Sequence, residues 1–136
     1  MTAKILANRI ITPDGTMLQS FSRHDFVKHT DANGKTYAVD GGLDYQRTFW
    51  HEDAPHTDAC VYTTDPFELI RQAFCWGSYG KDGKQPLHWK PLHTMTDEHI
   101  IAILATQHHI PWHIRGVFEN EQEYRHANNI QIKDPE

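Results

Sequence analysis

Residues 25–40 read DFVKHTDANGKTYAVD, and they predict the β-rich character of the first half of the chain. DFVKHT (25–30) and KTYAVD (35–40) contain the β-branched and aromatic residues that favour strands. Between them, DANG (31–34) closes on Asn-Gly, the strongest short signal for a hairpin turn. We therefore expect an antiparallel hairpin over residues 25–40.

A second hairpin is expected before this one. AKILANRII (3–11) is apolar and β-branched, TPDGT (12–16) has the proline and glycine of a turn, and MLQSF (17–21) can return as the paired strand. Downstream, GGLDYQR (41–47) breaks the strand pattern and ACVYTT (59–64) is a further short β segment. These segments predict an N-terminal antiparallel sheet.

Helical patterns follow the strands. DPFELIRQAF (65–74) opens with Asp-Pro and spaces its apolar residues as a helix does. TDEHIIAILATQ (96–107) has Thr96 as its cap, and WHIRGVFENEQEYRHAN (112–128) is a further helix, while PLHWKPL (86–92) is expected to be extended. The order predicts an α+β fold, with an N-terminal antiparallel β-sheet followed by C-terminal α-helices. We expect a single domain over residues 1–136, with a polar, frayed tail from residue 129.

Composition excludes several classes of protein. The net charge of -5 on 136 residues argues against binding of a nucleic-acid polymer, which needs a basic face. No apolar run is long enough to span a membrane, and the first residues lack a signal-peptide core, so we expect a cytoplasmic location. Cys60 and Cys75 are expected to be reduced and buried.

The stretch FCWGSYGKDGKQP (74–86) is the first candidate for binding chemistry. Its glycines at 77, 80 and 83 and its lysines at 81 and 84 are residue types that cradle anions. The phosphate-loop pattern and the dinucleotide fingerprint are both absent, so a plain connector is the commoner interpretation. The neighbouring Phe74, Trp76 and Tyr79 favour a ligand, because aromatic faces stack on bases.

Eleven histidines suggest metal or proton-transfer chemistry, but they are scattered along the chain. HHIPWH (108–113) is the densest group, and Pro111 spoils a regular helical pair. No zinc-protease or nucleophile motif is present, so the sequence nominates no catalytic residue and no metal site. A histidine-rich surface is the simplest interpretation.

Three stretches together resemble a known family: TPDGTMLQSFSRHDFVKHTDANGKTYAVDGGLDYQR (12–47), FCWGSYGKDGKQPLHWKPLHTMTDEHI (74–100) and ENEQEYR (119–125). The chain resembles the first anti-Thoeris family of small phage proteins over roughly residues 4–130. The resemblance implies a non-catalytic, cofactor-free sponge that binds glycocyclic ADP-ribose, an immune signal, in the host cytoplasm. It also implies a homo-oligomer built from dimers, with pockets at subunit interfaces and, in some members, separate sites for cyclic oligonucleotides.

Under this resemblance, stacking is expected of Phe74 and Trp76, and phosphate binding of Arg23, Arg47 and Arg125. The backbone from Gly80 to Lys84, including Lys81, is expected to line the pocket, and Arg115 suits a second pocket. Two other functions stay open: a metal-dependent nucleotide-cleaving enzyme, suggested by the histidines, and a small phage module that binds a protein.

Overall fold

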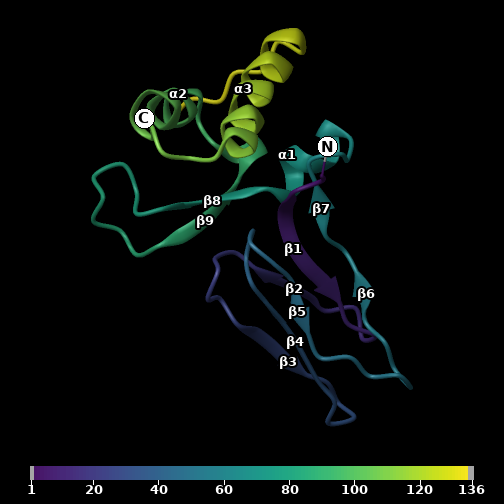
Figure 1. Cartoon of the computed structure of the whole chain (residues 1–136). Helices are drawn as coiled ribbons and strands as arrows, with labels where there is room; N and C mark the ends of the chain where they lie inside the picture. Colours follow the sequence, from purple (N-terminus) through teal and green to yellow (C-terminus); the bar gives the residue numbers. More distant parts are fainter. Residues whose placement is uncertain (1, 135–136) are drawn as a thin grey trace. The chain divides into compact units, whose positions relative to one another are not determined.

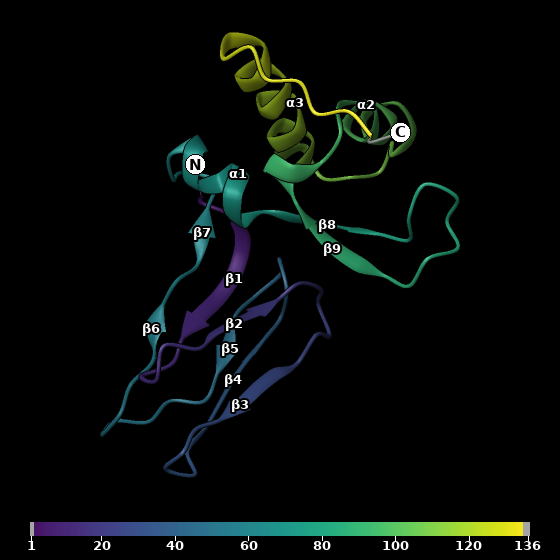
Figure 2. The ribbon, with the colours of Figure 1, turned by 180° about the vertical axis from the view of Figure 1, so that it is seen from behind.

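The computed structural model describes residues 2–134, and their contacts group into two compact units, Met1–Pro66 and Phe67–Glu136. Within the described residues, the first unit is built from β-strands, and the second contains three α-helices and a β-hairpin (Figures 1 and 2). The predicted α+β fold, with antiparallel sheets first and helices toward the C-terminus, is therefore confirmed. The single domain stays a prediction, and the two units are described separately.

The first unit holds two antiparallel sheets. Its longest strand, β1 (Ile5–Ile11), pairs with three short ones: β2 (Met17–Ser20), β6 (Thr57–Asp58) and β7 (Val61–Tyr62). The second sheet has the order β3-β4-β5, formed by Val27–Thr30, Thr36–Asp40 and Arg47–Thr48. Both predicted hairpins are confirmed, because β1 pairs with β2 and β3 pairs with β4.

The Asn-Gly turn fixes the register of the second hairpin. The Gly34 amide donates to the Asp31 carbonyl at 3.0 Å, which closes the turn and places Thr30 opposite Thr36. This register brings Tyr37 and Val39 to the interior, where they join Ile10 and Leu18 of the other sheet. Burial of these side chains is the main stabilising contribution in the first unit.

A buried amide also links the two sheets of the first unit. The Asn8 side chain, on β1, donates to the Asp40 carbonyl at 3.2 Å and to the Tyr45 carbonyl at 2.8 Å. Such bonds satisfy backbone carbonyls where little water is available to do so, and leaving a buried carbonyl unsatisfied is costly. Asn8 therefore holds the end of β4 and the segment that follows it against β1.

The second unit contains the three predicted helices, with ends that differ by up to two residues. They are α1 (Phe67–Ala73), α2 (Asp97–Thr106) and α3 (Trp112–Ala127), and a short 3-10 turn, η1 (Leu92–Thr94), precedes α2. Thr96 caps α2 as predicted, because its hydroxyl accepts from the His99 amide at 3.1 Å.

The glycine stretch contains a strand that the sequence did not predict. Residues Cys75–Ser78 form β8, which pairs antiparallel with β9 (His88–Pro91). Gly77 hides the strand pattern, and its missing side chain leaves room for the tryptophan ring on the paired strand. A Cβ at Gly77 would lie 3.1 Å from the Trp89 ring opposite. The stretch is therefore a hairpin with a long loop rather than a plain connector.

A buried ion network joins the helices of the second unit. Glu121 on α3 has no exposed surface, and it accepts from Arg71 of α1 at 2.8 Å through both oxygens. The same carboxylate accepts from Arg125 at 2.7 Å, and Arg125 also donates to Asp97 of α2 and to the Leu92 carbonyl. The bond to Glu121 raises the pKa of Arg71, which keeps the guanidinium charged.

The expectation of a frayed tail is wrong for the residues after α3. The Asp97 amide donates to the Ile132 carbonyl at 2.8 Å, and the Ile132 amide donates back to the Asp97 carboxylate. The Ile130 amide bonds the Arg125 carbonyl at 2.9 Å. Residues 135–136 of the expected tail lie outside the described residues.

Two further expectations can be compared with the structure. None of the helices in residues 2–134 is long and apolar enough to cross a membrane. No disulfide joins Cys60 and Cys75, and both are partly exposed rather than buried.

We expect Glu121→Gln to destabilise the second unit by about 3 kcal/mol, because removing one partner of a buried ion network leaves the other charges uncompensated. Urea unfolding followed by the far-ultraviolet helix signal measures this, since the described helices all lie in that unit. The matched control is Glu123→Gln, an exposed position on the same helix, with an expected change below about 0.5 kcal/mol. Equal unfolding midpoints for the two variants would contradict the role of Glu121.

Candidate functional site

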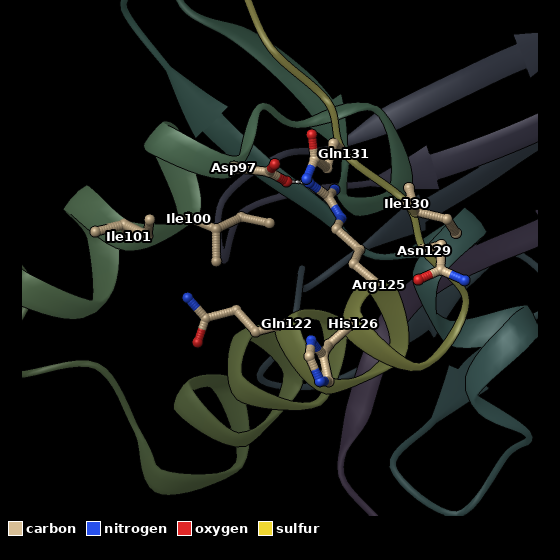
Figure 3. A pocket seen from close by; sticks show the side chains of 9 residues that line it. All are labelled: Asp97, Ile100, Ile101, Gln122, Arg125, His126, Asn129, Ile130 and Gln131. Carbon is tan, nitrogen blue, oxygen red and sulfur yellow. Dashed lines mark hydrogen bonds and ion pairs between the residues drawn. The ribbon is translucent and has the colours of Figure 1, made fainter.

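The second unit carries two cavities. The first, called the lysine pocket here, has a volume of about 280 Å³ and is lined by Ser78, Gly80, Lys81, Lys90, Thr96, Glu98, His99, Ala102 and Asp134. The second, called the helix pocket, has a volume of about 340 Å³ and is lined by Asp97, Ile100, Ile101, Gln122, Arg125, His126, Asn129, Ile130 and Gln131 (Figure 3). Both lie between α2 and neighbouring segments of the same unit.

Two ammonium groups give the lysine pocket its chemical character. Lys90 projects from β9, is partly buried, and has no ion-pair partner among the described residues. Lys81 projects from the hairpin loop and pairs with Asp134 at 3.3 Å, although the Lys81 side chain stays 85% exposed. An unpaired, partly buried cation favours an anionic ligand, since such a ligand replaces the water that the cation has lost.

His99 adds a titratable group beside Lys90. Burial lowers the pKa of His99, and the positive charge of Lys90 lowers it further. The imidazole is therefore neutral at pH 7, able to donate one hydrogen bond and accept another. It lies in the first turn of α2, whose cap is Thr96, and both residues line the pocket.

The glycine loop shapes the wall of this pocket rather than cradling an anion. Several of its amides have partners in the same hairpin: Gly80 donates to the Ser78 hydroxyl, Gly83 to the Gly80 carbonyl, and Gln85 to the Tyr79 carbonyl. Gly80 has a positive φ of 83°, and a Cβ there would lie 2.4 Å from Gln85. The loop therefore requires glycine at position 80 for its backbone geometry.

The aromatic residues expected to stack on a base are placed differently from one another. Phe74 is 1% exposed and packs edge-on against Phe118, so its ring has no face to offer a ligand in this unit. Trp76 also contacts Phe118 edge-on, but it is partly exposed and lies directly across the hairpin from Lys90. The burial of Phe74 gives no support to its expected stacking role, and stacking by either residue stays a prediction.

Arg23 and Arg47 belong to the first unit. Arg23 is exposed and lies 3.6 Å from Asp44. Arg47, on β5, donates to Asp40 at 2.6 Å, while its side chain remains 70% exposed. Hydrogen bonding to Asp40 raises the pKa of Arg47. Both arginines stay predicted ligand residues.

The remaining predicted residues lie in the second unit. Arg125 lines the helix pocket, but its donors are engaged by Glu121, Asp97 and Leu92, as Figure 3 shows in part. These bonds hold Arg125 within the ion network of the unit, and its phosphate-binding role stays a prediction. Arg115 bonds the Leu104 carbonyl and lines neither cavity, and Lys84 is exposed on the loop outside both.

Of the predicted residues, the structure brings Gly80 and Lys81 together in the lysine pocket. Sequence reasoning missed Lys90 and His99. A hairpin interpretation of residues 75–91 would have placed Lys90 on the strand that pairs with Trp76, but a loop this long does not by itself fix the register. Nothing in the sequence pattern indicates that His99 lies beside it.

The histidines do not assemble in residues 2–134: no group of three or more histidine, cysteine or acidic side chains there can hold a metal ion. Comparisons with models of protein families, with curated proteins and with solved structures found no match.

We expect Lys90→Met to raise the pKa of His99, because it removes a nearby positive charge, while burial keeps the pKa below about 6.5. An NMR titration of the imidazole resonances measures the change. Lys84→Met serves as the control, since it removes the same charge from the loop between β8 and β9, outside the pocket. Identical His99 titration curves in the wild type and Lys90→Met would show that the two groups are not neighbours.

Proposed function

We propose that this chain binds and sequesters a cyclic ADP-ribose-type signalling nucleotide without cleaving it. The single observation that carries the proposal is the lysine pocket, in which Lys90 has no ion-pair partner among the described residues and lies beside Lys81 and His99. A pyrophosphate group suits such a pocket, because ammonium groups bind phosphate oxygens through charge-assisted hydrogen bonds. The family resemblance supplies the identity of the nucleotide.

Sequestration requires tight binding and no chemistry. The pocket offers hydrogen-bond donors of several kinds: two ammonium groups, an imidazole and the Thr96 hydroxyl. Such groups favour retention of an intact anion, which is what a protein that intercepts a signal needs. In this proposal the chain is a viral immune-evasion protein that acts in the host cytoplasm.

The size of the pocket favours a site shared between two copies. Its volume of about 280 Å³ falls just below the range of about 300–1,000 Å³ typical of small-molecule sites. One pocket therefore holds the charged part of the nucleotide, and a second copy covers the rest. This agrees with the homo-oligomer built from dimers that the resemblance implies.

We expect Lys90→Gln to weaken the binding of cyclic ADP-ribose by about tenfold or more, because it removes a charge-assisted hydrogen bond. Isothermal titration calorimetry measures this, with Lys84→Gln as a control that changes the same charge outside the pocket. Equal affinity in the two variants would place the ligand elsewhere.

Retention is tested separately from affinity. The protein is incubated with cyclic ADP-ribose and then denatured by heat, and the released ligand is identified by mass spectrometry. Recovery of the intact nucleotide is the expected result. Its loss would favour a nucleotide-cleaving enzyme over a sponge.

A further inference from the structure

We propose that Asp134 is a built-in counter-ion of the lysine pocket, which an anionic ligand must displace from Lys81. The inference deepens the proposed function, because it concerns the regulation of that same pocket. The segment involved, residues 129–134, follows α3 and is called the tail here.

The backbone of the tail is held beside the start of α2. The Ile130 amide bonds the Arg125 carbonyl at 2.9 Å, and Ile132 exchanges two hydrogen bonds with Asp97. Figures 1 and 2 both show the chain turning back from the end of α3 toward α2. These bonds set the direction of the tail, so the position of Asp134 at the pocket is specified by the fold of the unit.

The contact that Asp134 makes is suited to exchange. Its carboxylate lies 3.3 Å from the Lys81 ammonium, and the two side chains are 47% and 85% exposed. An exposed pair of this kind contributes little to stability, because water screens it. A phosphate brings more charge and more acceptor oxygens to the same ammonium, and it therefore competes with the carboxylate.

Asp134 also acts on the second titratable group of the pocket. It raises the pKa of His99, against the lowering caused by burial and by Lys90 and His88 of β9. One tail carboxylate thus partly neutralises the field that an anionic ligand would meet. The consequence is a pocket whose affinity for any anion is lowered, because a ligand has to replace a carboxylate that is already there.

The test compares Asp134→Asn with Glu123→Gln, which makes the same charge change at an exposed position that lines neither cavity. Calorimetry at low salt uses two probes, inorganic pyrophosphate and cyclic ADP-ribose. We expect Asp134→Asn to bind each probe about two- to fivefold more tightly than the wild type, and Glu123→Gln to match the wild type. In a Lys81→Gln background the gain should vanish, because the competition is for Lys81.

A readout without ligand accompanies the binding data. Removing the Asp134 carboxylate should lower the pKa of His99 further in an NMR titration, whereas Glu123→Gln should leave it unchanged. The direction follows from the sign of the charge removed. An unchanged pKa in Asp134→Asn would show that the tail does not lie at the pocket and would overturn the inference.

The binding outcomes separate the two proposals. If the wild type binds cyclic ADP-ribose and Asp134→Asn binds it no more tightly, the counter-ion role fails and the proposed function stands. If pyrophosphate binds more tightly to Asp134→Asn while neither protein binds cyclic ADP-ribose, the counter-ion role stands and the proposed nucleotide is wrong. Absence of binding by either protein to either probe overturns both.

Discussion

The carboxylate of Glu121 accepts hydrogen bonds from two arginines in an interior that excludes water, and the architecture of the helical unit is arranged around it. Arg71 brings α1 to this carboxylate, and Arg125 extends the network to Asp97 and to the Leu92 carbonyl. Burying these charges is costly unless every partner is present. The network therefore holds the first turn of α2 in place, and with it Thr96 and His99.

Much of the fold follows from local sequence signals. The Asn-Gly turn and the strand patterns around it predict the second hairpin, and Thr96 predicts the start of α2, because both signals act within a few residues. The strand β8 escaped prediction, since Gly77 breaks the alternation of side chains and only Phe74 separates the strand from the end of α1. The Trp89 ring and the Leu87 side chain lie close to Gly77, which leaves little room for a larger residue there.

The sequence predicts less of the candidate site than of the fold. Phe74 directly follows α1 and continues the helical spacing of its apolar residues, and this spacing agrees with its burial in the core. Arg125 has the right chemistry for binding a phosphate. Its hydrogen-bond partners lie 4, 28 and 33 residues away in sequence, and the two distant ones reach it only in the tertiary fold. Lys90 and His99 become neighbours only when β9 and α2 pack in three dimensions.

The hydrogen bonds inside the glycine loop have a consequence for the affinity with which this hairpin could bind a ligand. Several of its amides already donate to a hydroxyl and to carbonyls of the same hairpin, which orders the loop in the absence of a ligand. Binding therefore costs less conformational entropy than it would with a flexible loop. Under the proposed function, selectivity would rest on side chains, chiefly Lys81 and Lys90, that can change while the loop keeps its shape. Such a wall is suited to evolving toward a differently charged ligand by single substitutions, with the backbone template preserved.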